Sequence, residues 1–286
     1  AEKIVATFQL QFVGKKSNSN PTAADKNIIV HCWRGGMRSA GVAWLLDLYG
    51  FKVYTIVGGY KVYRKWALEQ FEKQYPLCVI GGYTGSGKTG LLHALKSKGE
   101  NTIDLEALAQ HKGSAFGSLG ELPQPSQEMF ENMLALELHQ KNIADKLIWI
   151  EDESQRIGNV NIPAVLYRSK QASTLYFVDI PFEERLNHIV AGYGKFERDQ
   201  LVNAIIRIKK RLGGLETKTA VNYLIEDDIK NCFAVLLKYY DKWYLKSLLQ
   251  RQGLEKLITK IPCAAVEANE NAEKVLQSCI VEKSFL

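Results

Sequence analysis

The chain has 286 residues, of which 46% are apolar and 10% aromatic, which is enough material for two hydrophobic cores. Its apolar runs stay well below the roughly 18 to 20 residues of a membrane span, and its first residues lack the apolar core of a signal peptide. We therefore expect a globular protein of the cytoplasm with no membrane partner. The net charge of +6 favours polyanionic partners only weakly, because many metabolic enzymes carry a similar charge.

Five cysteines are scattered along the chain, and none of them forms a CxxC pair. This spacing is typical of reduced thiols rather than of a zinc site or a disulfide framework. We therefore expect no structural metal.

Short strands and amphipathic helices alternate before Pro76. They are a strand at 27–31, a helix at 39–49, a strand at 52–57 and a helix at 61–75. Proline ends the last helix, so we place the boundary between two domains there, with domains at 1–76 and 77–286. The polar stretch 14–24 is expected to form a loop.

The second domain is predicted to be an α/β sheet with a helical C-terminal region. Apolar strands are expected at 77–80, 147–150 and 175–178, with a helix at 127–139. Because strands and helices alternate, the sheet should be parallel. From Phe182 onward the pattern is almost wholly helical, with helices at 197–212 and 227–249.

A cysteine stands at the end of the first predicted strand, within the sequence HCWRGGMRS. Gly35 and Gly36 let this short loop turn backbone N–H groups inward, and the following helix adds its positive end. Such a loop stabilises an anion at its centre. We therefore expect an activated Cys32 thiolate, with positive charge supplied by Arg34 and Arg38.

The pattern HCxxGxxRS fits two classes of protein. It satisfies the signature of cysteine-dependent phosphatases, and it resembles the sulfur-transfer loop of rhodaneses in a version one residue longer than the usual form. The longer loop suits a tetrahedral phosphate-bearing substrate. The next strand, which ends in the sequence IVGGY, and the helix that carries Trp66 favour the rhodanese class.

The sequence GYTGSGKT at 82–89 is a complete Walker A motif between an apolar strand and a helix. Its backbone N–H groups would cradle a diphosphate, Lys88 would bridge phosphate oxygens, and Thr89 would offer its hydroxyl to Mg²⁺. The expected phosphate-binding residues are Gly82, Gly85, Ser86, Gly87, Lys88 and Thr89.

An acidic partner for this loop is expected where a neighbouring strand ends. The strand LIWI is followed by Glu151 and Asp152, and we prefer one of these two as the Walker B-like carboxylate. Asp104, after a shorter apolar pair, is the alternative. The loop itself leaves open whether the diphosphate belongs to ATP, GTP or another compound.

The order of the two loops, a C-x5-R loop followed by a P-loop in one chain, resembles the tRNA 2-selenouridine synthase family. The resemblance covers about residues 27–250 and includes the specific string HKGSAFG at 111–117. Its other parts are DLE at 104–106, EDE at 151–153 with RIG at 156–158, PFEER at 181–185, KRLGG at 210–214 and YYD at 239–241.

This resemblance implies that the sulfur of 2-thiouridine at the tRNA wobble position is replaced by selenium from selenophosphate. The exchange would run through a geranylated intermediate made from geranyl diphosphate. Cys32 would carry the selenium-transfer step, and the P-loop would hold geranyl diphosphate for binding rather than for hydrolysis. The implied partners are tRNA and an enzyme that produces selenophosphate. Family members open with a longer rhodanese stretch, so the resemblance also implies a rhodanese-like domain that lacks its first part.

A basic ridge is the candidate tRNA contact. Arg207, Lys210 and Arg211 lie at i, i+3 and i+4 of a predicted helix with Lys209 beside them, a spacing suited to phosphates, although a solvated helix face is the alternative. The aromatic residues of the last long helix could stack on bases, but we expect them to pack in the core. They are Tyr239, Tyr240, Trp243 and Tyr244.

Two other functions compete with the RNA-modifying transferase. A cysteine-dependent phosphatase fused to a nucleotide-binding domain would turn over an aryl phosphate, and it would need an aspartate general acid. A P-loop kinase or binding protein would act whether or not Cys32 is present.

Overall fold

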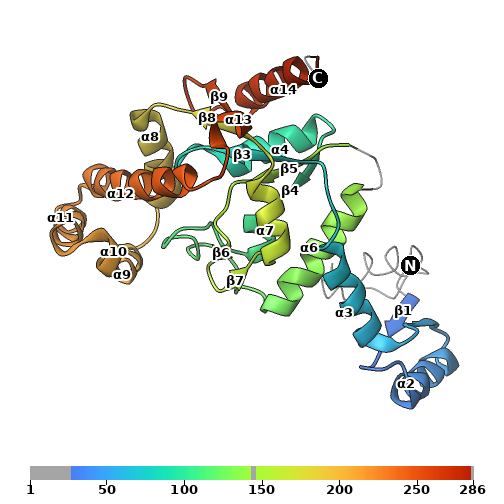
Figure 1. The fold of residues 1–286 in the computed structure, drawn as a ribbon. Coiled ribbons are helices and arrows are strands. Elements are labelled where there is room, and N and C mark those ends of the chain that lie inside the picture. Colours follow the sequence, from blue (N-terminus) through green and yellow to red (C-terminus); the bar gives the residue numbers. More distant parts are fainter. Residues whose placement is uncertain (1–26, 143–145, 285–286) are drawn as a thin grey trace. The chain divides into compact units, whose positions relative to one another are not determined.

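The computed structural model describes residues 27–142 and 146–284, and the loop expected at 14–24 lies outside these ranges. The chain divides into two compact units, residues 1–72 and residues 73–286 (Figure 1). We call them unit 1 and unit 2. None of the helices that the structure describes is long and apolar enough to cross a membrane.

Unit 1 contains two parallel strands and two helices within its described part. They are β1 (Asn27–Val30), α2 (Met37–Leu48), β2 (Lys52–Thr55) and α3 (Gly59–Gln70). The strands pair in register, with Ile29 opposite Tyr54. The first turn of α3 is tied to the loop after β1, because Tyr60 N donates to Cys32 O at 2.9 Å and Lys61 N donates to Trp33 O at 3.0 Å.

Unit 2 is built on a five-stranded parallel sheet, which confirms the predicted α/β class. The strand order is β4-β5-β3-β8-β9, so β3 lies in the middle. The strands are β3 (Leu77–Gly81), β4 (Asn101–Ile103), β5 (Ile148–Glu151), β8 (Thr174–Asp179) and β9 (Ile258–Pro262), and a separate antiparallel pair is formed by β6 (Arg156–Ile157) and β7 (Val160–Asn161).

Helices cover both faces of this sheet (Figure 1). Alternate residues of a strand point to opposite faces, so Cys78 and Ile80 of the fully buried β3 face the core formed with α4 (Lys88–Ser97) and α14 (Ala268–Ser284). Figure 1 shows α6 (Gln127–Lys141) and α7 (Ala164–Gln171) on the other side. The sheet is therefore fixed from both faces, and its carboxyl-terminal edge is left for a site.

A second apolar core lies among the helices that follow β8, where buried residues such as Leu186, Ile205 and Phe233 meet. The helices are α8 (Phe182–Tyr193), α9 (Arg198–Arg207), α10 (Lys209–Leu212), α11 (Gly214–Ile225) and α12 (Ile229–Leu249). Two short helices complete the unit, α5 (Leu105–Ala109) and α13 (Leu254–Leu257).

One prediction for the C-terminal half was wrong. The single helix expected at 197–212 is interrupted at Ile208, where ψ is 4° rather than helical, so the chain forms α9 and α10. The region after Phe182 also contains a strand, β9, which pairs with β8 at one end of the sheet order. In β9 only Ile261 is buried, so an apolar run that would mark a strand is lacking.

Candidate active site

The Cys32 loop of unit 1 holds its sulfur with hydrogen bonds. Sγ accepts from the Gly36 N–H at 3.2 Å and lies 3.4 Å from the Ser39 Oγ. These interactions, the Ser39 hydroxyl first and the Gly36 N–H second, lower the pKa of Cys32 to about 6. The lowered pKa favours the thiolate at neutral pH, which is the form in which a cysteine can act as a nucleophile.

The two arginines of this loop contribute less to the lowered pKa of Cys32 than the sequence suggested. The side chains of Arg34 and Arg38 are exposed, and Arg34 acts on the sulfur through its backbone N–H. Gly35 has a φ of +68°, and a Cβ there would lie 2.7 Å from the Gly59 nitrogen, so the loop geometry needs glycine. Ser39, the last residue of HCWRGGMRS, was not among the predicted site residues.

The P-loop of unit 2 runs from the end of β3 to the start of α4, as its sequence predicts. Gly85 and Gly87 have φ values of +83° and +70°, and a Cβ on Gly85 would lie 2.7 Å from Ile189 Cδ1. Lys88 Nζ donates to Gly82 O at 3.3 Å and lies 6.0 Å from the centroid of the Tyr244 ring. The lysine is thus held at the loop mouth.

Three carboxylates gather beside this loop. Glu106, Glu151 and Glu153 each offer an oxygen, and these oxygens lie within 4.8 Å of one another. Thr89 Oγ1 donates to Glu106 Oε2 at 2.8 Å, which joins the P-loop to the cluster. Oxygens so placed can hold a divalent cation.

Burial raises the pKa of each of these carboxyl groups, and repulsion within the cluster adds to this rise for Glu151 and Glu153. The pKa of Glu153 rises to about 7, through burial first and the neighbouring Glu106 second. The same two causes raise the pKa of Glu151 well above its usual range, and burial raises that of Glu106. Burial and like charge thus favour the protonated form of these carboxyl groups.

Of the two carboxylates predicted after LIWI, Glu151 joins the cluster and Asp152 does not. The Asp152 Oδ1 accepts from Lys170 Nζ at 3.2 Å and from Arg251 Nη2 at 2.6 Å, and its Oδ2 accepts from Tyr244 at 2.8 Å. Burial raises the pKa of Asp152, but the charges of Lys170 and Arg251 outweigh that effect and hold the pKa below its usual value. Asp152 is therefore held in a network of ion pairs and hydrogen bonds outside the carboxylate cluster.

Asp104, the alternative carboxylate, caps a helix. Its Oδ1 accepts from Ala107 N at 2.8 Å at the start of α5, and its Oδ2 lies 3.0 Å from His93 Nε2. Glu106 and Glu153, the other members of the cluster, were not among the predicted acidic partners, although both lie in strings that carry the family resemblance. These two residues meet because α5 and the end of β5 are neighbours in the fold, and their separation in the sequence does not reveal this contact.

Helices α8 and α12 hold the P-loop from outside. The Arg185 guanidinium donates to both carboxylate oxygens of Asp241 at 2.8 Å and to the Thr84 carbonyl at 3.0 Å. The Tyr244 hydroxyl also accepts from Gly82 N at 3.2 Å. The P-loop is thus anchored at Gly82 and at Thr84.

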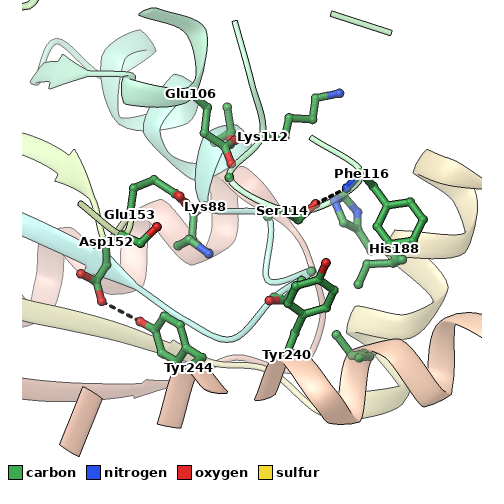
Figure 2. Close-up of a pocket in the computed structure, with 18 of the residues that line it drawn as sticks. Lys88, Glu106, Lys112, Ser114, Phe116, Asp152, Glu153, His188, Tyr240 and Tyr244 are labelled. Carbon is green, nitrogen blue, oxygen red and sulfur yellow. Dashed lines mark hydrogen bonds between the residues drawn. The ribbon is translucent and has the colours of Figure 1, made fainter. Parts of the chain in front are cut away.

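A cavity of about 570 Å³ opens from the P-loop into the helical core. Figure 2 shows Lys88, Glu106 and Glu153 on one side of it, and Phe116, His188 and Tyr240 on the other. The lining also contains an apolar set, Phe116, Ile189, Tyr193, Phe233, Leu236 and Leu237. A ligand that fits both sides carries an anionic head and an apolar body.

The loop HKGSAFG forms one wall of this cavity. Ala115 N donates to the Tyr240 hydroxyl at 3.2 Å, and Phe116 N donates to Ser114 Oγ at 3.2 Å. The Phe116 ring then lies 5.5 Å from the Phe233 ring between centroids. The loop therefore places an aromatic side chain opposite the phosphate-binding residues.

The predicted basic ridge is exposed and lies outside the residues that line the cavity. Arg207 ends α9, whereas Lys209, Lys210 and Arg211 belong to α10, so the helical register between them is broken at Ile208. Burial lowers the pKa of His111, and the Arg207 guanidinium adds to this effect, which places Arg207 near the HKGSAFG loop.

Comparison with known proteins places the chain in a family. The profile of the tRNA 2-selenouridine synthase AAA domain matches residues 75–269. The tRNA 2-selenouridine synthase of Shewanella sediminis (strain HAW-EB3) is 38% identical over 261 residues, which cover 79% of this chain and 69% of the relative. The tRNA 2-selenouridine synthase of Nitrosomonas eutropha (strain DSM 101675 / C91 / Nm57) is 31% identical over 280 residues, which cover 78% of this chain and 70% of the relative. The chain belongs to the tRNA 2-selenouridine synthase family.

Proposed function

We propose that this protein modifies the wobble uridine of tRNA, replacing the 2-thio sulfur by selenium through a geranylated intermediate. The family membership supports an enzyme that acts on tRNA. The chemistry assigned to each loop below is our proposal. In it, unit 1 is a rhodanese-like domain and unit 2 holds the prenyl donor.

The observation that carries this proposal is the two-sided cavity of unit 2. Its P-loop side presents the groups that bind a diphosphate, and its opposite side is a wall of aromatic and aliphatic residues such as Phe116 and Phe233. A prenyl diphosphate matches both sides, because its head is anionic and its chain is apolar. We therefore propose geranyl diphosphate as the ligand, and we propose that the P-loop serves to bind this diphosphate rather than to hydrolyse it.

Two buried polar atoms without a hydrogen-bond partner support an anionic head group and a cation beside the P-loop. The Ser86 Oγ of the P-loop and the Glu151 Oε2 of the cluster are buried and have no hydrogen-bond partner within the described ranges. Thr89, Glu106, Glu151 and Glu153 would hold Mg²⁺, which when bound neutralises charge on the diphosphate. These residues fit Mg²⁺ because all their donor atoms are oxygens, the ligands that this hard cation prefers.

The first reaction is an alkylation. The 2-thio sulfur of the uridine attacks the C1 carbon of geranyl diphosphate, a C–S bond forms, the C1–O bond breaks, and the electron pair leaves with the diphosphate. The N3 proton of the uridine is lost to solvent, so the alkylated base is neutral. P-loop N–H groups and Lys88 stabilise the negative charge on that leaving group. The wall opposite excludes water from the reacting carbon and so disfavours hydrolysis.

The second reaction requires a nucleophile, for which we propose the Cys32 thiolate. Its pKa of about 6 keeps it ionised at neutral pH. The Cys32 thiolate attacks C2 of the geranylated uridine, and the C2–S(geranyl) bond breaks so that the alkylated sulfur leaves as a thiol. The selenium of selenophosphate then attacks C2 and displaces the Cys32 thiolate, and water cleaves the Se–P bond to release phosphate. A partner enzyme that supplies selenophosphate, and a cytoplasmic location, belong to the same proposal.

Ligand affinities test the assignment of the cavity. Calorimetry with the full chain and Mg²⁺ compares geranyl diphosphate, dimethylallyl diphosphate and ATP. Each buried CH₂ contributes about 0.8 kcal/mol, so the longer chain should bind at least about tenfold more tightly than dimethylallyl diphosphate. Lys88→Ala should weaken both diphosphates. Tighter binding of ATP than of geranyl diphosphate would refute the assignment and favour a kinase.

A further inference from the structure

Helix α12 exposes a row of basic and aromatic side chains beside the cavity. It carries four lysines and a single acidic residue, Asp241, which is held by Arg185. Three of these lysines, Lys238, Lys242 and Lys246, recur at every fourth position and are exposed. Within the described part of the chain, no carboxylate forms an ion pair with any of the three. The row thus presents uncompensated positive charge.

Trp243 lies within this row and also at the rim of the cavity. Its side chain is 43% exposed, although it lines the same cavity as Tyr240 and Tyr244. The ammonium of Lys246 lies over its ring at 5.1 Å from the centroid, and the Tyr239 ring lies edge-on at 6.3 Å. A large aromatic ring in this position is half available to a partner outside the protein.

Positive charge continues beyond α12 to the basic residues of α10. Burial raises the pKa of Tyr239, and the Arg211 guanidinium is close enough to oppose that rise. Arg211 thus reaches the aromatic row from a second helix. Basic groups interleaved with aromatic rings fit a nucleic acid strand, because the cations bind phosphates and the rings stack on bases.

We propose that this face of α12 docks an unpaired RNA strand, with Trp243 stacking on a base at the mouth of the cavity. The strand must be unpaired, because only unstacked bases offer their faces to an aromatic ring. Lys238, Lys242 and Lys246 bind the backbone phosphates. The inference rests on the proposed function, since docking here brings a base to the wall where the prenyl donor is held.

The test measures RNA binding apart from chemistry. A fluorescent anticodon stem-loop that contains 2-thiouridine is titrated with the full chain, and the dissociation constant is read by anisotropy at several salt concentrations. Trp243→Ala should weaken binding about tenfold, the size expected for loss of one base–aromatic stack, while Trp243→Phe keeps most of the affinity. The triple variant K238Q/K242Q/K246Q should lower the salt slope by about 2, because each single-strand phosphate contact contributes about 0.7.

Lys96→Gln, an exposed lysine on α4, is the matched control and should leave both quantities unchanged. Geranyl diphosphate binding by the triple variant shows that it is folded. Suppose that the unmodified protein geranylates the RNA, and that Trp243→Ala and the triple variant bind the RNA as tightly as Lys96→Gln does. The docking face is then refuted and the proposed function stands. If these variants lose binding while the unmodified protein fails to geranylate, the docking face stands and the proposed function fails. Loss of binding to anionic vesicles alone, with RNA affinity intact, would assign the face to lipid and overturn the inference.

Discussion

Replacing Tyr244 by phenylalanine removes one hydroxyl that joins two parts of the site. That hydroxyl donates to Asp152 Oδ2 at 2.8 Å and accepts from Gly82 N at 3.2 Å. The phenylalanine ring can keep the contacts with Tyr83 and Phe177, whose centroids lie 5.7 and 6.1 Å away. The substitution therefore isolates the hydrogen bonds from the packing.

The expected loss of stability follows from those two bonds. Asp152 is charged and its side chain is 9% exposed, and a hydrogen bond to a charged group contributes about 1.5 to 3 kcal/mol. Asp152 keeps Lys170 and Arg251 as partners, which offsets part of the loss, so the free energy of unfolding should fall by about 2 kcal/mol. At a typical urea m-value of about 2 kcal/mol/M, the midpoint would move by about 1 M.

Urea unfolding followed by circular dichroism measures this shift. Tyr223→Phe is the control, because Tyr223 lies on α11 and forms no described side-chain hydrogen bond. Its free energy of unfolding should stay within about 0.5 kcal/mol of that of the unmodified protein. Equal midpoints for Tyr244→Phe and Tyr223→Phe, with unchanged m-values, would refute the anchoring role of the hydroxyl.

Three further predictions concern charges at the two loops. Alkylation of Cys32 by iodoacetamide, followed by mass spectrometry, should rise with pH through about 6, and Ser39→Ala should move that midpoint upward; an unmoved midpoint contradicts the hydrogen-bond account. The pKa of Glu153 is raised from an ordinary 4.5 to about 7, so without Mg²⁺ the free energy of unfolding should fall as the pH rises from 4.5 to 7. Glu153→Gln, or added Mg²⁺, should reduce this fall, which is measured as the urea midpoint at each pH. Equal pH profiles for Glu153→Gln and the unmodified protein would exclude the raised pKa. Asp241→Asn leaves the buried Arg185 charge uncompensated and should cost about 3 kcal/mol in the same assay, and a cost below about 1 kcal/mol would show that the pair is solvated.

The elements that define the P-loop site could be predicted from local pattern. Apolar strands such as β3 and the glycine spacing of GYTGSGKT are local features, and their structure follows the expected strand, loop and helix order. Edge strand β9 could not be predicted in this way. Its sequence ITKIP buries a single residue, and its pairing with β8 is a tertiary contact.

The acidic partner of the P-loop shows why sequence adjacency is an incomplete guide. Glu151, Asp152 and Glu153 are consecutive, yet a strand sends neighbouring side chains to opposite faces. Asp152 therefore meets Lys170, whereas Glu151 meets Glu106 from α5. Such a choice is decided by packing around the strand end, which the sequence does not display.

Mass spectrometry of a 2-thiouridine tRNA tests the central claim most directly. The tRNA is incubated with geranyl diphosphate, Mg²⁺ and selenophosphate, beside the unmodified protein, Cys32→Ala and Lys88→Ala. We predict geranylated and selenated uridine with the unmodified protein, geranylated uridine alone with Cys32→Ala, and neither with Lys88→Ala. Normal geranylation by Lys88→Ala, or selenation by Cys32→Ala, would contradict the proposed division of labour between the two loops.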